Sequence, residues 1–234
     1  MDKWQRVVGI IQARMNSTRL PGKVLMPLAG APLLQRLVER VRGARSMDFL
    51  VVATSNGAAD DPIAALCAQI GVPCHRGSEV DVLGRILNAA EQERADVVVR
   101  LTADNAFVDA KLVDLVVDEF VFATPPVDYA HNIGESGFAY GLYVEVVAMR
   151  ALRAAAASSE PDDREHVTWY VRRHPDIFKH RCVMAARRFP SVRLSIDTAA
   201  DYRRLSAVFE QLYAVDPAFA CTVLAENVLA RTLR

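Results

Sequence analysis

Short runs of β-branched residues alternate with longer amphipathic stretches as far as Phe120, and this alternation limits the possible folds more than any other feature of the chain. The runs that predict buried strands are 7–11, 49–53, 72–75 and 96–101. The stretches that predict helices are 32–41, 60–70, 81–94 and 109–120. Alternation at this spacing indicates βαβ units. The sequence therefore predicts an α/β fold, with a mostly parallel sheet covered by helices on both faces.

The regular pattern weakens after Thr124, where Pro125 and Pro126 interrupt the chain. We expect residues 1–234 to form a single domain with an inserted arm at about 130–186. The elements expected from 143 onward are a strand at 143–147, helices at 149–158 and 162–173, strands at 178–185 and 192–196, and helices beginning at Ala199 and Pro217. In parallel sheets, ligands bind beyond the carboxyl ends of the strands, so those ends are where a site is expected.

The composition excludes several broad classes of protein. Lys plus Arg and Asp plus Glu both number 28, so the formal net charge is zero. A general nucleic-acid binder would carry a net positive charge, and any anion site must therefore be local. The four cysteines form no CxxC pair, which indicates reduced thiols and a cytoplasmic protein. The sequence contains no run of 18 apolar residues, so it predicts no membrane span.

A basic loop, QARMNSTRLPGK, follows the first predicted strand. Its cations Arg14, Arg19 and Lys23 have no acid among them, so an external anion is a natural partner. Arginine suits bidentate contact with phosphate, and lysine acts as a point charge. The spacing matches neither a Walker A loop nor GxGxxG. On composition alone, a phosphate site and a solvated basic loop remain equal alternatives.

Two aspartates, Asp104 and Asp197, each follow a predicted strand. Carboxylates at such positions can hold Mg²⁺ that bridges nucleotide phosphates. Each also has a structural alternative as a helix N-cap. Asp109 is better placed than Asp104 to cap the helix at 109–120, whereas the D-T-x-x-D pattern at Asp197 resembles a capping box. Two carboxylates beside a basic loop would form a coherent Mg²⁺-nucleotide site.

The segment IIQARMNSTRLPGKVL closely resembles the signature of the cytidylyltransferases that activate acidic sugars, a family that includes the acylneuraminate and 3-deoxy-manno-octulosonate enzymes. The most similar branch is the one named for spore-coat polysaccharide biosynthesis protein F. Further motifs occur in the family's order along nearly the whole chain: VVATSN, DDPI, HRGSEVDVLGR, DVVVRLTADN, GLYVEV, DREHVTWYV and LSIDTAADY.

The resemblance implies a nucleotide-diphospho-sugar transferase-like, Rossmann-like three-layer fold, with an inserted dimerisation subregion and a homodimer. It implies transfer of CMP from CTP to an acidic sugar with Mg²⁺ as cofactor. The catalytic residues would be Arg14, Lys23, Asp104 and Asp197, and the two aspartates would bind the metal. The nucleotide would contact Gln12, Ala13, Arg14, Ser17, Arg19, Lys23, Arg76 and Ser78. The acceptor would contact Glu145, Arg164, Glu165 and His166.

The chain departs from the family pattern at the metal turn, where Ala103-Asp104-Asn105-Ala106 replaces the usual Gly-Asp-Cys-Pro or Gly-Asp-Glu-Pro. Gly84 replaces the aspartate of the DVLDR motif. Two alternatives therefore stay open beside the main interpretation. One is a nucleotidyltransferase that uses another nucleoside triphosphate or a sugar-phosphate acceptor. The other is a non-catalytic member that binds nucleotide or sugar.

Overall fold

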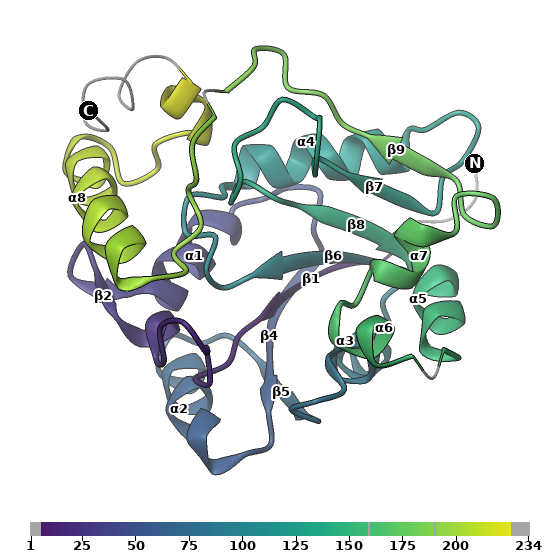
Figure 1. Ribbon diagram of the computed structural model, residues 1–234, viewed down its shortest axis with the longest axis horizontal. Helices are drawn as coiled ribbons and strands as arrows, with labels where there is room; N and C mark the ends of the chain where they lie inside the picture. The colour runs from purple at the N-terminus through teal and green to yellow at the C-terminus, as the bar shows by residue number, and fades with distance from the viewer. Residues whose placement is uncertain (1–5, 159, 190, 226–234) are drawn as a thin grey trace.

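A mixed sheet of seven strands, in the order β5-β4-β1-β6-β8-β7-β9, organises the computed structural model, which describes residues 6–158, 160–189 and 191–225 (Figure 1). The strands are β1 (Val7–Gln12), β4 (Phe49–Ser55), β5 (Cys74–Gly77), β6 (Val97–Thr102), β7 (Tyr129–His131), β8 (Glu145–Ala148) and β9 (His180–Cys182). Strands β5, β4, β1 and β6 are parallel, and β8 pairs antiparallel with both β6 and β7. The predicted α/β fold with a mostly parallel sheet is confirmed.

Side chains of β1 alternate between two hydrophobic cores, one on each face of the sheet. Val7 and Ile11 join the larger core, which is covered by α1 (Leu33–Val41), α2 (Asp61–Gln69), α4 (Ala110–Val121) and α8 (Ala199–Val215). Val8 and Ile10 join the second core, which is covered by α3 (Val82–Gln92), α5 (Met149–Ala156) and α7 (Trp169–Arg173). Because both faces are buried, the strand is apolar throughout, and the polar loop that follows it begins where the sheet ends.

The predicted helix at 162–173 is wrong, since the chain forms two short helices, α6 (Pro161–Glu165) and α7, with a break between them. Val167 and Thr168 in the break are buried, and the Thr168 hydroxyl donates a 2.5 Å hydrogen bond to Oε1 of Glu145 on β8. This tertiary contact replaces the helical turn that local propensity would favour. The expected strand at 178–185 is reduced to the three residues of β9.

The predicted strand at 192–196 is absent from the described residues, and only an isolated bridge joins Tyr140 to Arg193. The segment instead runs between two loops. Leu194 N donates to Tyr140 O at 2.7 Å, and Ile196 N donates to Asp104 O at 3.0 Å. These bonds bring the end of the segment beside the end of β6, although no strand pairing connects them.

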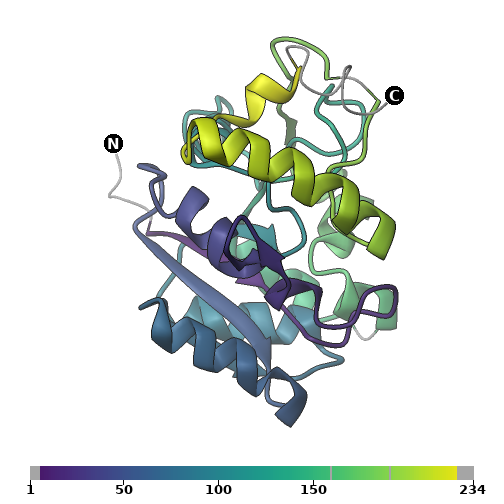
Figure 2. The same cartoon turned by 90° about the vertical axis from the view of Figure 1, so that its left-hand side faces the viewer.

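Helix α8 begins at a capping box formed by Thr198 and Asp201. The Asp197 side chain is therefore not the cap that the D-T-x-x-D pattern suggested. Figure 2 shows α8 lying over the small β2–β3 hairpin (Pro27–Leu28 and Ala31–Pro32), where the hydroxyl of Tyr202 donates to Pro27 O at 2.5 Å. Instead of a helix from Pro217, a 3₁₀ helix, η3, occupies Cys221–Ala225. The remaining 3₁₀ turns are η1 (Lys23–Leu25) and η2 (Ala58–Asp60).

Residues 130–186 contribute β7 to β9 and α5 to α7, and β8 extends the main sheet directly from β6. Val167 and Val171, two apolar residues of this region, are fully buried within their own chain and so are not available for a subunit interface. The inserted arm and the homodimer therefore stay predictions that rest on the family resemblance. No helix in the described ranges is long and apolar enough to cross a membrane.

Candidate active site

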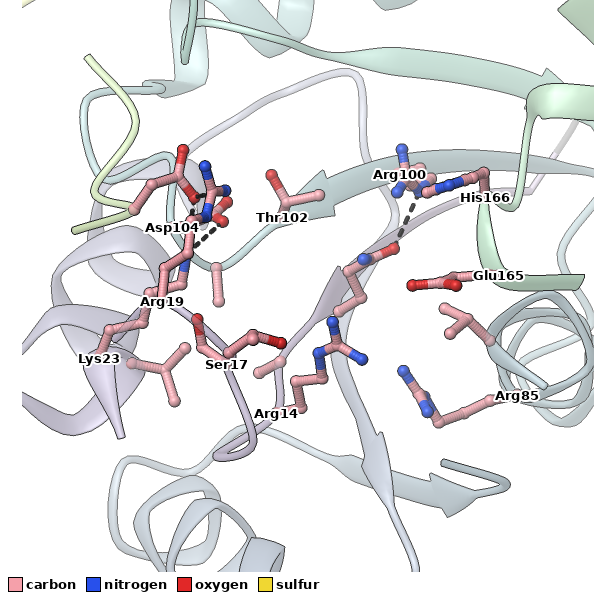
Figure 3. A pocket seen from close by; sticks show the side chains of 17 residues that line it. Arg14, Ser17, Arg19, Lys23, Arg85, Arg100, Thr102, Asp104, Glu165 and His166 are labelled. Carbon is pink, nitrogen blue, oxygen red and sulfur yellow. Dashed lines mark hydrogen bonds and ion pairs between the residues drawn. The ribbon is translucent and has the colours of Figure 1, made fainter. Parts of the chain in front are cut away.

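A pocket of about 320 Å³ opens beyond the carboxyl ends of β1 and β6 (Figure 3). Ten of the residues singled out in the sequence line it: Gln12, Ala13, Arg14, Ser17, Arg19, Lys23, Asp104, Glu165, His166 and Asp197. They come from the loop after β1, the turn after β6, the segment before α8 and the end of α6. The rule that ligands bind beyond the strand ends of a parallel sheet thus predicted the location of the pocket.

The loop after β1 is closed by backbone hydrogen bonds to a single carbonyl. Met15 O accepts from Ser17 N at 2.9 Å and from Gly22 N at 2.8 Å. Gly22 has a φ of 73°, in the left-handed region that glycine adopts without strain, and this turns the chain into η1. Asp60 fixes the loop from outside, since its Oδ1 accepts from Met15 N at 2.7 Å. The basic residues are therefore carried by a closed, anchored turn.

Asp60 stands at the N-cap position of α2 but makes no side-chain cap hydrogen bond to that helix. Its second oxygen, Oδ2, accepts from Ser55 N at 3.0 Å, so this buried carboxylate joins the end of β4 to the basic loop. Burial would raise the pKa of Asp60, but hydrogen bonding, led by the Ser55 side chain and followed by the backbone N–H groups of Met15 and Ser55, lowers the pKa below its ordinary value. A loop held by a charged acceptor is stabilised more than one held by a neutral acceptor.

Lys23 lies between the two aspartates. Its ammonium is 2.7 Å from Oδ2 of Asp104 and 3.1 Å from Oδ1 of Asp197, and it also donates to Ile196 O. Arg19 forms a 2.7 Å ion pair with Asp197. The expectation that these cations lack a protein acid is therefore wrong for Lys23 and Arg19, because the fold supplies acids from distant positions. Arg14 forms no ion pair within the described residues.

Asp197 is almost completely buried and strongly paired. Its Oδ2 accepts from Arg193 at 2.5 Å and from the Ser195 hydroxyl at 3.1 Å. Burial would raise the pKa of this carboxyl, but the hydrogen bond from Arg193 and the charge of Lys23 hold the pKa below its ordinary value. Asp197 therefore carries a full negative charge at neutral pH.

Asp104 belongs to a turn whose usual glycine and proline are missing, yet other contacts hold it. Asn105 N donates to Thr102 O at 3.1 Å, and the Asn105 amide donates to the Thr102 hydroxyl at 2.8 Å. Ile196 N donates to the Asp104 carbonyl. About a quarter of the Asp104 side chain is exposed, and this exposed part faces the pocket. The altered turn therefore still presents its carboxylate.

The donor set fits a magnesium ion. Asp104 and Asp197 converge on one cation, the ammonium of Lys23, and their oxygens are the hard ligands that Mg²⁺ prefers. The site supplies two carboxylates, and the described ranges contain no group of three or more His, Cys, Asp or Glu residues placed to hold a metal. Two carboxylates suffice for an ion that completes its coordination with substrate phosphates and water.

Arg76 and Ser78, expected beside the nucleotide, do not line the pocket. The Arg76 guanidinium donates to the carbonyls of Ser55 and Gly57 and pairs with Asp61. The Ser78 hydroxyl accepts from Asp81 N at the start of α3. Both residues instead support the loops at the ends of β4 and β5.

Glu145 and Arg164 also lie outside the pocket lining. Glu145 is buried and accepts hydrogen bonds from Arg100, Tyr129 and Thr168. Burial would raise the pKa of Glu145, but the Arg100 charge and these hydrogen bonds lower it.

Arg164 pairs with Asp81 and donates to Ala156 O at 2.7 Å. Oδ1 of the same Asp81 accepts from Gly84 N at 2.8 Å, so a side chain at position 84 would contact this carboxylate, with an added Cβ 2.8 Å from its Cγ. Of the four predicted acceptor residues, only Glu165 and His166 line the pocket.

Two arginines that the sequence analysis missed, Arg85 and Arg100, line the same pocket. Arg100 is a charged residue inside the buried strand VVVRLT, an irregularity that could have identified it. Its Nε donates to Oε1 of Gln12 at 2.9 Å, which fixes the orientation of that amide. Arg85 gave a weaker signal, since an arginine on an amphipathic helix is expected to be exposed.

Comparison with known proteins gave consistent matches. A family model described as cytidylyltransferase matches residues 8–219. The spore coat polysaccharide biosynthesis protein SpsF of Bacillus subtilis is 38% identical over 215 residues, which cover 88% of this chain and 87% of that protein. A solved cytidylyltransferase from Leptospira borgpetersenii has a TM-score of 0.90 and 30% identity, covering 98% of this chain and 96% of that one.

A shorter match extends to an enzyme whose name identifies its sugar. The 3-deoxy-manno-octulosonate cytidylyltransferase of Zea mays is 38% identical over 121 residues, which cover 48% of this chain and 38% of that protein. The family match at 8–219 includes the basic loop and both pocket aspartates.

Proposed function

The chain belongs to the cytidylyltransferase family, and we propose that it transfers CMP from CTP to an acidic sugar of the ulosonic or sialic type for the synthesis of surface polysaccharide. One observation of the site supports this most directly: a basic loop and two aspartates converge on Lys23 in the pocket at the strand ends. A phosphate-binding loop beside metal-binding carboxylates is the arrangement that nucleotidyl transfer requires.

In the proposed reaction, a sugar hydroxyl oxygen attacks the α-phosphorus of CTP. A new P–O bond joins CMP to the sugar, the bond between the α-phosphorus and the bridging oxygen breaks, and pyrophosphate leaves with that oxygen. The hydroxyl proton passes to solvent or to a pocket base. Because the protein makes no covalent bond, its contribution is to position the reactants and to stabilise charge on the phosphates.

Arg14, Arg19 and Lys23 would bind the triphosphate and stabilise the departing pyrophosphate. Asp104 and Asp197 would hold Mg²⁺, which would supply Lewis-acid stabilisation of the charge on the phosphates. Gln12, Ala13 and Ser17 line the same part of the pocket and would contact the nucleotide. Arg76 and Ser78 would act indirectly, by supporting the loops at the ends of β4 and β5 beside the pocket.

The acceptor sugar would approach from the side of Glu165 and His166. Glu145 would affect the acceptor only through Arg100, and Arg164 only through Asp81. A homodimer built partly from 130–186 remains part of the proposal, and light scattering at micromolar protein concentration tests it.

The direct test is incubation with CTP, Mg²⁺ and a panel of acidic sugars that includes N-acetylneuraminate and 3-deoxy-manno-octulosonate. Release of pyrophosphate together with a CMP-sugar supports the proposal, and the panel identifies the sugar. Failure with every acid while CTP still binds would favour the non-catalytic alternative.

A thermal-shift comparison of the four nucleoside triphosphates tests the other alternative. A ligand at 100 times its Kd stabilises the folded state by about 2.7 kcal/mol, so a preference for another base would be visible.

A further inference from the structure

Two of the four cysteines, Cys67 and Cys74, meet between α2 and β5, which lie side by side at one edge of the sheet (Figure 1). Cys67 belongs to the last turn of α2 and is fully buried, whereas Cys74 is the first residue of β5 and is partly exposed. The two thiols hydrogen-bond to each other. They form no CxxC motif, because Cys74 follows Cys67 by seven positions.

The way in which α2 ends brings the chain back toward Cys67. Val72 N donates to Cys67 O at 2.9 Å, and Gly71 N donates to Ala68 O at 3.4 Å. Gly71 has a φ of 62°, in the left-handed region. These two bonds and this φ define a Schellman motif, which packs the residue after the glycine against the end of the helix. Val72 and Cys67 are accordingly both buried in the larger core.

The next residues place Cys74 on the same side as Val72. Pro73 O accepts from Val52 N at 2.9 Å, so the chain has already joined the sheet beside β4. Side chains alternate between the two faces of a sheet, and Cys74 lies two positions beyond Val72. Cys74 therefore faces α2, and it packs against the core that contains Cys67.

A second contact holds the two elements together at the other end of α2. Arg76 on β5 forms a 2.7 Å ion pair with Asp61, the first residue of α2. Arg76 also donates to the carbonyls of Ser55 and Gly57 at the end of β4. Because β5 and α2 are fixed at both ends, the sulfur atoms meet in the folded protein without movement of either element.

The surroundings make the two thiols unequal. The hydrogen bond with Cys67 and the charge of Arg76 lower the pKa of Cys74, although burial and Asp60 oppose this shift. The hydrogen bond with Cys74, together with burial, raises the pKa of Cys67. Cys67 is therefore the S–H donor, and Cys74 is the sulfur that ionises first. A thiolate is the reactive form of cysteine, and the partly exposed Cys74 is the one that a solute can reach.

We propose that Cys74 and Cys67 form a redox site, in which Cys74 reacts with a hydroperoxide and Cys67 captures the product as a reversible disulfide. This site lies outside the pocket and is independent of the function proposed above. Capture as a disulfide would protect Cys74, since a sulfenic acid that is not captured is oxidised further to a sulfinic acid, which thiols do not reduce.

The proposed reaction has two steps. The Cys74 thiolate attacks one oxygen of hydrogen peroxide, the O–O bond breaks, and the departing hydroxide takes up a proton to give water and a sulfenic acid on Cys74. The Cys67 sulfur then attacks the Cys74 sulfur, the S–O bond breaks, and the hydroxyl group leaves as water with the Cys67 proton. The two thiols lose two electrons and two protons, and the peroxide is reduced to two molecules of water.

The test is disulfide mapping of the reduced wild-type protein after treatment with hydrogen peroxide. Remaining thiols are blocked with N-ethylmaleimide in denaturant, and the protein is digested with trypsin. Both cysteines lie in one tryptic peptide, 46–76, because no Lys or Arg occurs between Ser46 and Cys74. We expect this peptide to lose the mass of two hydrogen atoms and to carry no maleimide. After reduction with dithiothreitol it should take up two.

Cys182 is the internal control in the same sample. It is exposed on β9, at the opposite edge of the sheet from Cys74, and burial of its sulfur raises its pKa. We expect peptide 46–76 to be oxidised before Cys182. If peptide 46–76 still carries two maleimides when Cys182 is oxidised, the proposal is wrong. A sulfinic acid on Cys74 beside an unreacted Cys67 would also overturn it.

Two single variants separate the proposed roles, and Cys182→Ser is their matched control. Cys67→Ser should leave Cys74 without a capturing thiol, so dimedone, which labels sulfenic acids, should mark Cys74 far more strongly than in the wild type. Cys74→Ser should leave the buried Cys67 reduced. Cys182→Ser should form the disulfide as the wild type does. Equal dimedone labelling of Cys74 in the wild type and in Cys67→Ser would exclude capture by Cys67.

The mapping of the wild type needs no variant, so it decides the proposal even if Cys67→Ser does not fold. It also needs neither nucleotide nor sugar. A protein that forms the disulfide but transfers no CMP would refute the proposed function alone, and an active enzyme without the disulfide would refute the redox site alone.

Discussion

The ammonium of Lys23 donates a 3.1 Å hydrogen bond to Oδ1 of Asp197, a residue 174 positions further along the chain. This bond joins the basic loop after β1 to the segment that precedes α8, and Asp104 completes the cluster from the end of β6. The cation that we propose to bind phosphate and the carboxylates that we propose to bind the metal neutralise one another in the protein alone. When a nucleotide and a metal bind, each would exchange its protein partner for a ligand of the same charge.

The pairing of Asp197 predicts how stability depends on pH. The pKa of Asp197 in the folded protein lies below its ordinary value, so the stability it contributes is complete above that ordinary value and is lost as the pH falls through the lowered pKa. We expect the melting temperature to fall below about pH 4. The Asp197→Asn variant should melt lower than the wild type at neutral pH and approach it in acid. Parallel pH curves for the two proteins would contradict this.

Arg19→Ala should weaken binding of Mg-CTP about tenfold to a hundredfold, because a charge-assisted contact with phosphate is lost. Stability should change little, since more than half of the Arg19 side chain is exposed and exposed ion pairs contribute about 0 to 1 kcal/mol. Calorimetric titration measures the affinity. Arg193→Ala is the control, because Arg193 also pairs with Asp197 but does not line the pocket. Equal affinities of Arg19→Ala and the wild type would exclude Arg19 from the phosphate site.

Asp104→Asn should abolish turnover with little change in melting temperature. The substitution keeps the shape of the side chain but removes a charge needed to hold the metal. Steady-state pyrophosphate release, followed over a range of Mg²⁺ concentrations, is compared with the melting curve of the same preparation. A fully active variant would remove Asp104 from the proposed metal site.

Asp60→Asn should act on the site from outside the pocket. An amide has a single acceptor oxygen, so it cannot serve both Met15 N and Ser55 N, and we expect a loss of about 2 kcal/mol in the free energy of unfolding. Because Met15 belongs to the basic loop, the KM for CTP should also rise. Asp61→Asn is the neighbouring control, since Asp61 is exposed and its one ion pair among the described residues is with Arg76. If both variants behave alike, Asp60 does not hold the loop.

Glu145→Ala should destabilise the protein by about 3 to 5 kcal/mol, because it leaves Arg100 partly buried without its partner. Glu165→Gln, at an exposed pocket residue, should leave the melting temperature nearly unchanged and raise the KM for the sugar. Denaturant unfolding and acceptor titrations separate the two effects. A stable Glu145→Ala variant with an impaired acceptor KM would restore Glu145 as a direct acceptor contact.

Local sequence determined the parts of this protein whose physical cause is local. The apolar runs at 7–11 and 96–101 form buried parallel strands because both of their faces are covered, and the helical stripe at 32–41 forms α1 for the same reason. The basic loop was visible as three cations in twelve residues, and the rule for strand ends indicated where its ligand would lie.

Only the tertiary structure decided which charges meet. Asp104 and Asp197 form ion pairs with Lys23, although they lie 81 and 174 positions further along the chain. No local sequence pattern predicts a contact between residues so far apart. The predicted helix at 162–173 breaks because Thr168 bonds to Glu145, and the predicted strand at 192–196 becomes a link between loops. Arg85 looked like an exposed helix residue, but packing buries it in the pocket without an acid. Burial and pairing depend on contacts between distant segments, and those contacts exist only once the chain has folded.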